Sequence, residues 1–154
     1  MVWRLKQFNE LTSIELYNIL QERTRVFVVE QDCPYQEVDG KDLEAYHLFK
    51  ENDSGIMAYL RVLPPGVSYP QASLGRVMVK EEYRGEGLAK ELVTMGLEVI
   101  RQELGENAVK IQAQNYLKKF YGSFGFQAVT GIYLEDNIPH IDMVLEMSGE
   151  KSSQ

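Results

Sequence analysis

The chain has 154 residues, of which 44% are apolar and 25% are charged, and its formal net charge at pH 7 is -7. This size and balance predict one soluble globular domain with a single core. The acidic charge argues against a nucleic-acid partner and is compatible with a cationic amine ligand, while no apolar run approaches the ~20 residues of a membrane span.

The N-terminal part of the chain predicts a strand, a helix and a loop. Val2 to Phe8 alternates weakly between apolar and polar residues, as a strand does. Thr12 and Glu15 have the spacing of a capping box, and apolar residues then fall on one face, so we expect a helix over 13–28. Residues 31–41 contain Cys, Pro, Gly and three acids, which is typical of a loop or a short irregular helix.

Three strands are expected in the middle of the chain. Residues 45–50 and 56–63 flank an Asn-Asp-Ser-Gly segment at 52–55, which has the composition of a hairpin turn. A loop over 64–73 begins with Pro-Pro-Gly, and the strand 74–79 follows it.

The C-terminal part predicts an amphipathic helix, a strand, a short helix and two closing strands. The helix begins at Leu88, the strand alternates from Val109, and Asn115 is expected to cap the short helix, which Gly125 closes in a left-handed conformation. The last strands are expected at 127–130 and 140–147, separated by a polar loop.

These elements form a single domain of the α+β (mixed α/β) class, spanning residues 1–147, with a flexible tail over 148–154. No internal repeat or interdomain linker is visible in the sequence.

Cysteine and histidine are rare. Cys33 is the only cysteine, so no disulfide can form within the chain, and a reducing, cytoplasmic compartment is expected. Cys33 is interpreted as a small loop residue ahead of Pro34 rather than as a nucleophile acting with His47. Two histidines and one cysteine, widely spaced, predict no metal site.

The most informative segment is the junction between the strand 74–79 and the helix from Leu88, which reads Arg84-Gly85-Glu86-Gly87-Leu88-Ala89. Two glycines allow a tight turn, and the unpaired N–H groups at a helix N-terminus attract an anion such as a pyrophosphate. A glycine turn required for steric reasons alone is the alternative. Neither a Walker loop nor a dinucleotide fingerprint fits the spacing.

Two motifs resemble the GNAT superfamily of N-acetyltransferases. The strand 74–79 followed by Arg84 to Ala89 is similar to the family's Arg/Gln-x-x-Gly-x-Gly/Ala motif, and Asn115, Tyr121 and Gly125 occur at the family's usual spacing. Further segments resemble the ElaA-like subgroup, and these are Val28 to Gln31, Cys33 to Tyr35, Asp39-Gly40, Tyr133 to Asp136 and Ile138 to His140. Lys118 departs from the alanine that is frequent in the family, and Ala89 is a permitted variant.

The resemblance implies a central, mostly antiparallel twisted sheet that is splayed between its fourth and fifth strands, with helices on both faces. Acetyl-CoA would lie in the splay. The resemblance implies three groups of residues that bind it. The pyrophosphate would bind to the loop that begins at Arg84, through the amides of Gly85, Glu86, Gly87, Leu88 and Ala89. The pantetheine would pair with the backbone of Val77, Met78 and Val79, and its thiol end would lie near Asn115 and Tyr121.

The implied activity is direct transfer of an acetyl group from acetyl-CoA to a primary amine of a small molecule or peptide, without a metal. A homodimer is one assembly that the family allows. The alternative is an acyl-CoA-binding or sensing module that has the same fold and little turnover. Retention of Tyr121, Glu30 and His47 favours the enzyme.

Tyr121 is the expected general acid, since a protonated phenol can donate to the leaving thiolate, although an apolar contact beside Phe120 is the competing interpretation. Glu30 and His47 are the candidate general bases, and a water relay is the alternative.

Five residues are expected to bind the acceptor substrate: Glu30, Asp39, His47, His140 and Asp142. Each also has an ordinary explanation, as a solvated or loop-capping carboxylate or as a packed histidine. Arg61 and Arg76 are expected to form surface ion pairs.

Overall fold

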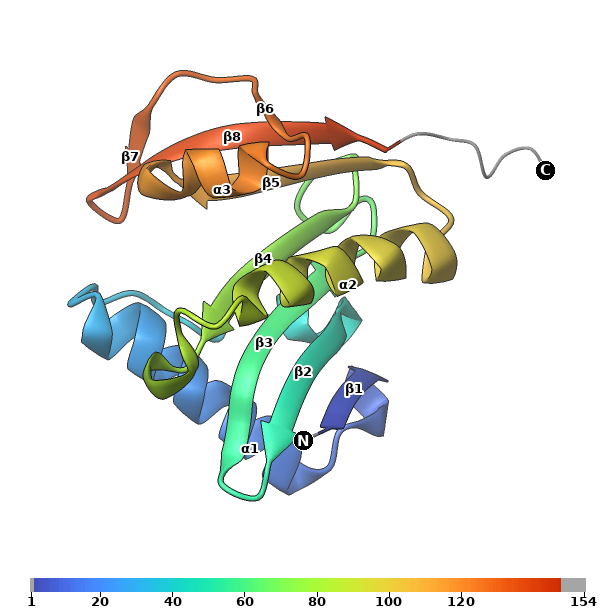
Figure 1. Ribbon diagram of the computed structural model, residues 1–154, viewed down its shortest axis with the longest axis vertical. Coiled ribbons are helices and arrows are strands. Elements are labelled where there is room, and N and C mark those ends of the chain that lie inside the picture. The colour runs from blue at the N-terminus through green and yellow to red at the C-terminus, as the bar shows by residue number, and fades with distance from the viewer. Residues whose placement is uncertain (1, 148–154) are drawn as a thin grey trace.

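The computed structural model describes residues 2–147, and the tail expected at 148–154 lies outside the described residues. The strands form two antiparallel sheets (Figure 1). The first sheet has the order β1 (Val2–Gln7), β2 (Tyr46–Asn52), β3 (Gly55–Leu63) and β4 (Ser73–Val79). The second has the order β5 (Ala108–Gln114), β8 (Ile138–Glu146) and β6 (Gln127–Ala128), and β7 (Tyr133–Glu135) also pairs with β8.

The two sheets meet at β4 and β5. A parallel bridge joins Ala72 to Val109, and the Lys110 N–H donates to the Ala72 carbonyl at 2.9 Å. From this bridge the two strands run in the same direction and diverge (Figure 1). The splay between the fourth and fifth strands is therefore confirmed. Beyond the bridge, no strand within residues 2–147 pairs with the edge of β4 that faces β5.

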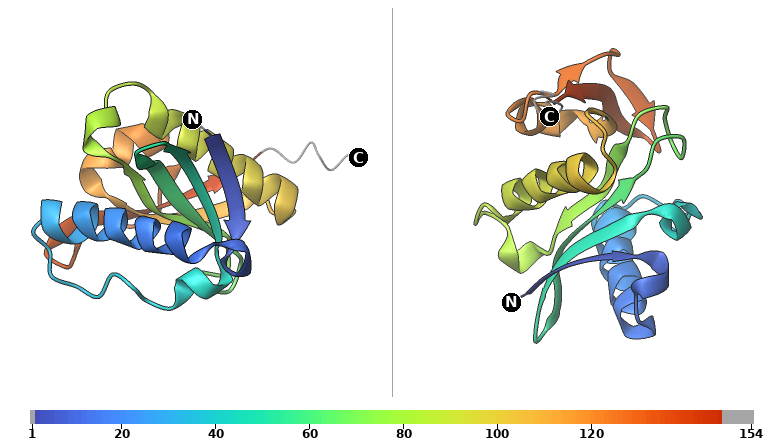
Figure 2. Two further views of the ribbon diagram at one scale, coloured as in Figure 1. Left: turned by 90° about the horizontal axis from the view of Figure 1, so that it is seen from below. Right: turned by 90° about the vertical axis from the view of Figure 1, so that its right-hand side faces the viewer.

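Helices cover both faces of the first sheet (Figure 2). α1 (Ser13–Thr24) packs on one face, and α2 (Leu88–Glu103) packs on the other, against β3 and β4. Because both faces of β3 are covered, the run from Ile56 to Leu63 is buried without alternation. The larger core cluster lies under α2 and continues into the second sheet to Tyr121 and Phe126.

The N-terminal helix starts as expected and ends differently. The Thr12 hydroxyl accepts from the Glu15 N–H at 3.0 Å, and the Glu15 carboxylate accepts from the Thr12 N–H at 2.9 Å, so the capping box is confirmed. The α-helix stops at Thr24, however, and a π-helical segment continues it over Arg25–Glu30. This segment is rich in valine, whose branched side chains crowd the preceding turn of an α-helix.

The C-terminal elements differ from the prediction in two places. Asn115 does not cap the short helix α3 (Lys118–Gly122); it is the first residue of a 3-10 turn over Asn115–Leu117. The expected polar loop before the last strand contains β7, which forms a hairpin with β8. Asp136 and Asn137 make its turn at φ 52° and 64°, a left-handed conformation that Asp and Asn tolerate better than most residues.

Candidate active site

A cavity of about 690 Å³ occupies the splay between the two sheets. Its walls are β4 from Leu74 to Val79, β5 from Ile111 to Gln114, the π-helical end of α1 and the turn between β7 and β8. A smaller pocket of about 180 Å³ lies next to it, between the end of β4 and the N-terminus of α2. The cavity therefore extends from the open edge of β4 to the glycine-containing loop.

The wall formed by β4 contains a β-bulge. Gly75 pairs with Arg61 and Met78 pairs with Tyr59, so Arg76 and Val77 together stand opposite a single residue of β3. Arg76 has a φ of 51°, which is unusual for a non-glycine residue. A bulge removes one residue from the ladder and turns the strand, so it directs backbone groups of β4 away from β3 and toward the cavity.

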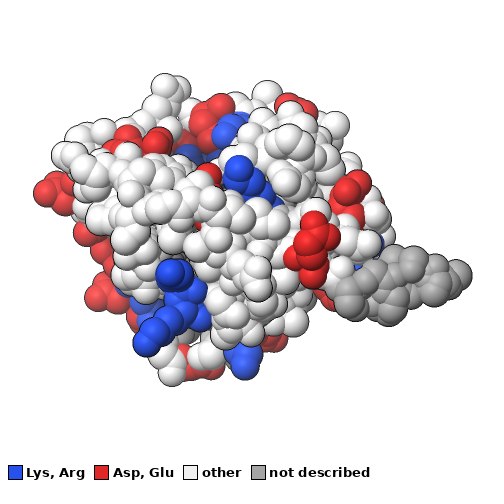
Figure 3. Space-filling view, turned by 90° about the horizontal axis from the view of Figure 1, so that it is seen from above, with Lys and Arg blue, Asp and Glu red and all other residues white. Residues whose placement is uncertain are grey.

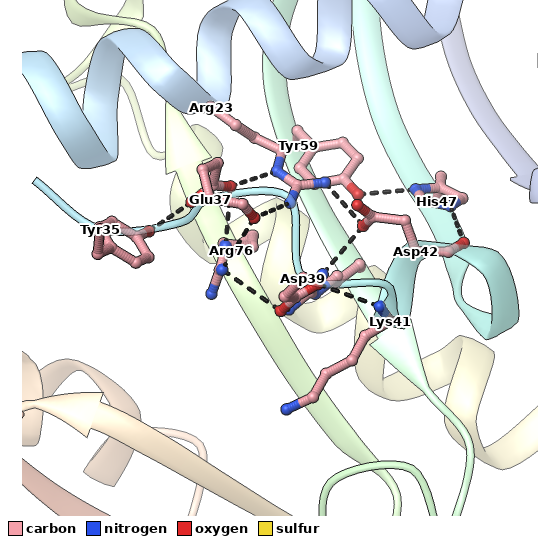
Figure 4. Close-up of polar contacts among 10 residues, drawn as sticks. Arg23, Tyr35, Glu37, Asp39, Lys41, Asp42, His47, Tyr59 and Arg76 are labelled. Atoms are coloured by element: carbon pink, nitrogen blue, oxygen red, sulfur yellow. Dashed lines mark hydrogen bonds and ion pairs between the residues drawn. The ribbon is translucent and has the colours of Figure 1, made fainter.

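A network of buried charges holds this bulge in place (Figure 4). The Arg76 guanidinium donates to the Glu37 carboxylate at 2.8 Å and to the Glu37 carbonyl at 3.2 Å. Arg23 is 0% exposed and donates to the same carboxylate at 2.5 Å and to Asp42 at 2.7 Å. The loop that contains Glu37 is thus fixed to α1 and to β4 at once.

Asp39 and Asp42 belong to the same network through Arg61. The Arg61 guanidinium donates to Asp39 at 2.6 and 2.9 Å and to Asp42 at 2.9 Å. Burial opposes ionisation of Asp39, but the hydrogen bonds and charge of Arg61 outweigh it and hold the pKa of Asp39 well below its usual range. Arg61 is 3% exposed, so the expectation of a surface ion pair is wrong for this residue.

His47 lies away from the cavity. It is 0% exposed and is not among the residues that line the space between the sheets. Its Nε2 donates to the Asp42 carbonyl at 3.0 Å, and its Nδ1 accepts from the Tyr59 hydroxyl at 2.7 Å (Figure 4). Burial lowers the pKa of His47. A neutral imidazole with both nitrogens bonded gives no support to a role in proton transfer or in acceptor binding.

Glu30 lines the cavity but is occupied by Arg84. The Arg84 guanidinium donates to both carboxylate oxygens, at 2.6 and 3.1 Å, and its Nε donates to the Val79 carbonyl at 2.7 Å. The hydrogen bond from Arg84 holds the pKa of Glu30 below its usual value. Glu30 is therefore a weak proton acceptor, and the pair connects the end of α1 to the glycine-containing loop.

The loop before α2 has the backbone that the sequence pattern requires. Gly85 and Gly87 have φ values of 85° and 81°, and Gly87 is the N-cap residue immediately before α2. A side chain at either position would be strained, although nothing lies within 4 Å of a Cβ built there. The glycines therefore serve the turn and leave open space in front of the helix N-terminus. The smaller pocket is lined by Val79, Arg84, Gly85, Gly87, Leu88 and Ala89 together with neighbours from α2 and α3.

Tyr121 lines the cavity from the side of the second sheet and is 6% exposed. Its ring packs edge-on against Phe120 at 5.1 Å and Phe126 at 5.9 Å. Within residues 2–147 its hydroxyl makes no hydrogen bond, and burial raises the pKa of Tyr121. The phenol is thus protonated at neutral pH and free to donate. Asn115 is half-buried and is not one of the lining residues.

His140 lines the cavity from β8, opposite the β4 wall, and its Nδ1 lies 2.7 Å from the Ile138 carbonyl oxygen. Asp142 lies on the same face of the strand but outside the lining, where its carboxylate accepts from the Tyr133 hydroxyl. The structure therefore brings Glu30, Asp39 and His140 to one cavity and leaves His47 and Asp142 outside it.

Arg23, Glu37 and Asp42 were not among the site residues expected from the sequence. The clustering of three carboxylates at positions 37, 39 and 42, with arginines on two neighbouring strands, was the available signal. On the face seen in Figure 3, which looks onto the second sheet, basic and acidic side chains are interspersed with uncharged areas. None of the helices within 2–147 is long and apolar enough to cross a membrane, and no group of three or more His, Cys, Asp or Glu side chains in that range could hold a metal ion.

Comparison with known proteins identifies the family. The family model described as "Acetyltransferase (GNAT) domain" matches residues 15–147. The chain belongs to the GNAT acetyltransferase family. Protein ElaA from Escherichia coli strain K12 is 40% identical over 147 residues, which cover 94% of this chain and 96% of that protein. The chain is thus an ElaA-like member of the family.

Solved structures agree with this assignment. The crystal structure of an acyl-CoA N-acyltransferase from Pseudomonas aeruginosa is 45% identical, with a TM-score of 0.89 and coverage of 94% of this chain and 98% of that chain. The crystal structure of Escherichia coli ElaA is 39% identical, with a TM-score of 0.88 and coverage of 94% and 99%. The GNAT-like fold expected from the motifs is confirmed.

Proposed function

We propose that the chain is a cytoplasmic N-acetyltransferase that binds acetyl-CoA between β4 and β5 and transfers the acetyl group directly to a primary amine. The observation that carries this proposal is the cavity in the splay, which connects an unpaired strand edge, a glycine-containing helix N-terminus and a buried phenol. Membership of the GNAT family supports it.

The open edge of β4 accounts for the pantetheine. On its other edge β4 pairs with β3, as Ala58 with Val79 and Tyr59 with Met78, but the divergence of β5 leaves the groups that face the cavity without a partner strand. Backbone N–H and C=O groups require partners, and the two amides of pantetheine can supply them as an added strand does. In this proposal the backbone from Val77 to Val79 binds the pantetheine arm.

The N-terminus of α2 is the proposed binding site of the pyrophosphate. Its first N–H groups have no partner within the helix, and the aligned peptide dipoles give this end a positive partial charge. The turn at Gly85 and Gly87 allows close approach of an anion to the amides from Gly85 to Ala89. Arg84 stands beside them and carries a positive charge that Glu30 neutralises in this structure.

The chemistry of the transfer follows from the side chains around the thioester. Backbone N–H groups at the bulge in β4 would polarise the thioester carbonyl. Tyr121, held in an apolar setting, would donate its proton to the departing thiolate. In this proposal Asn115, in the 3-10 turn that precedes α3, lies near the thiol end of the pantetheine.

The test is acetyl-CoA turnover with a panel of amines that contains amino acids, peptides with free N-termini, polyamines and aminosugars. Free thiol release is followed, and acetyl-CoA binding is measured in parallel by calorimetry. Amine-dependent release is the expected result. Binding without release for any amine would instead favour a sensing module, and failure to bind acetyl-CoA contradicts the proposal altogether.

A further inference from the structure

The transfer reaction needs a group that removes a proton from the attacking ammonium, and the charged side chains near the cavity are unequal candidates. Glu30 is paired with Arg84, and Asp39 is held by Arg61. His47 is buried, with both ring nitrogens bonded. His140 lines the cavity and, within the described part of the chain, makes its hydrogen bond through one ring nitrogen alone.

We propose that His140 is the general base of this acetyl transfer, an assignment that rests on the proposed function. Its Nδ1 lies 2.7 Å from the Ile138 carbonyl oxygen. A carbonyl oxygen can only accept, so Nδ1 carries the hydrogen of the neutral imidazole. Nε2 is then left with an unprotonated lone pair. The backbone of the β7–β8 hairpin thereby fixes the tautomer that a proton acceptor requires.

The orientation of the imidazole is also fixed from the side. The Tyr133 ring stacks on it, with centroids 6.3 Å apart and an interplanar angle of 28°. Tyr133 is itself held by a hydrogen bond to Asp142 and by one from Gln112 at 2.9 Å. Asp142 and Gln112 therefore fix Tyr133, and Tyr133 fixes the imidazole of His140. Asp142 is a positioning residue in this arrangement.

Acidic groups predominate around the ring. The titratable and charged groups on the elements next to it are Tyr133 and Glu135 on β7, Asp136 in the hairpin turn, Asp142 on β8, Lys110 on β5 and Cys33, whose thiol donates to the Asp136 carbonyl at 3.5 Å. Lys110 lies 3.9 Å from Asp142 and offsets part of that negative charge. Within the described residues none of these groups hydrogen-bonds to the ring, so the assignment rests on the Nδ1 contact and on the place of His140 in the cavity lining.

The proposed step balances as follows. Nε2 of His140 takes one proton from the ammonium group of the acceptor, and the freed amine forms a C–N bond to the thioester carbon. Collapse of the tetrahedral intermediate breaks the C–S bond, and the thiolate takes a proton from Tyr121. The amine nitrogen then loses a second proton, which reprotonates the Tyr121 phenolate. His140 releases the first proton to solvent. The products are the acetamide, free CoA and one proton, and both the base and the acid belong to residues that line the cavity.

The first experiment measures the tautomer, and it does not depend on knowing the acceptor. The chain has two histidines, so long-range ¹H–¹⁵N spectra of the imidazoles contain two spin systems. Comparison with the His140→Gln variant assigns them. We expect the neutral imidazole of His140 to be protonated at Nδ1 and unprotonated at Nε2. A dominant Nε2–H tautomer would overturn the proposal whatever the acetylation assays show.

The second experiment measures catalysis, using the best acceptor from the amine panel. We expect kcat to fall about 10²-fold in His140→Gln and His140→Ala, with an unchanged KM for acetyl-CoA, because general base catalysis contributes on that order. Added imidazole should restore part of the rate of His140→Ala, and the restored rate should rise with pH as imidazole deprotonates. Pyrazole, a ring of the same size and a far weaker base, is the matched control and should not restore it.

The outcomes separate the two proposals. If the wild-type protein turns over and the kcat of His140→Gln lies within about twofold of it, the base assignment is overturned and the proposed transferase activity is not. Equal rescue by imidazole and pyrazole overturns it as well, since filling a cavity would then suffice. No transfer by the wild-type protein to any amine contradicts the proposed function, and the base assignment is refuted with it.

Discussion

Replacing Tyr121 with phenylalanine removes one oxygen atom and keeps the ring that packs against Phe120 and Phe126. Within the described residues the hydroxyl has no hydrogen-bond partner, so its loss should change the free energy of unfolding by less than about 1 kcal/mol. The catalytic effect should be much larger. A positioned general acid contributes about 10²-fold or more, which corresponds to at least about 2.7 kcal/mol in the activation free energy.

The assay combines three measurements on Tyr121→Phe and on a control, Tyr17→Phe. Tyr17 is 67% exposed on α1 and lies outside the cavity lining, so the control makes the same chemical change at a neutral position. We expect kcat for CoA release to fall only in Tyr121→Phe. The calorimetric Kd for acetyl-CoA and the urea midpoint should stay close to wild type in both variants. A kcat unchanged in Tyr121→Phe would refute the role as general acid, and a weakened Kd would show that the hydroxyl serves binding instead.

Three further predictions concern the loop and the charge network. Gly87→Ala places a side chain at a φ of 81° and should lower the unfolding free energy by about 1 kcal/mol. Gly87→Glu also adds a negative charge and should weaken the calorimetric Kd for CoA at least about tenfold. Equal Kd values in the two variants would contradict the pyrophosphate site. Arg23→Met removes two charge-assisted hydrogen bonds and leaves Glu37 with Arg76 and Asp42 with Arg61 as remaining partners, so it should cost about 3 to 5 kcal/mol in urea unfolding. Glu98→Ala removes an exposed ion pair and should cost less than about 1 kcal/mol; similar losses in the two variants would refute the stabilising role of the network. The pKa of Asp39 is lower in the folded state than its unfolded value of about 3.9, so its contribution is present above that pH and is lost as pH falls through the folded pKa. The urea midpoint should therefore fall below about pH 4, and less steeply in Asp39→Asn; identical slopes would contradict the ion pairing.

Local signals in the sequence predicted the parts of the fold that depend on neighbouring residues. The Thr12–Glu15 capping box is a local requirement and is confirmed. The tight turn expected at Gly85 and Gly87 is also local, and both glycines have a positive φ. The splay came from the family resemblance rather than from periodicity. It depends on the contact between Ala72 and Val109, which are far apart in the chain.

Other features depend on tertiary contacts that no local pattern contains. The hairpin turn at Asp136 and Asn137 lacks glycine, and β7 is stabilised by pairing with β8, so composition alone indicated a loop. His47 alternates like any strand residue, and only the positions of Tyr59 and the Asp42 carbonyl show that both its nitrogens are bonded.

The candidate site shows the same division. Most residues of the first motif and Tyr121 of the second line the cavity or the smaller pocket, whereas Asn115 and Gly125 line neither. The acceptor side could not be predicted, because Glu30 and Asp39 are each paired with an arginine from a distant part of the chain. The sequence shows that a carboxylate is present and could act as a base. Only the structure shows whether an ion pair with an arginine hinders it from accepting a proton.

A crystal structure of the protein with bound CoA tests the proposal that acetyl-CoA lies between β4 and β5. We expect the pyrophosphate on the amides from Gly85 to Ala89, the pantetheine beside Val77 to Val79, and the sulfur within hydrogen-bond distance of the Tyr121 hydroxyl. CoA bound at any other surface, with the splay between the sheets left empty, would contradict it.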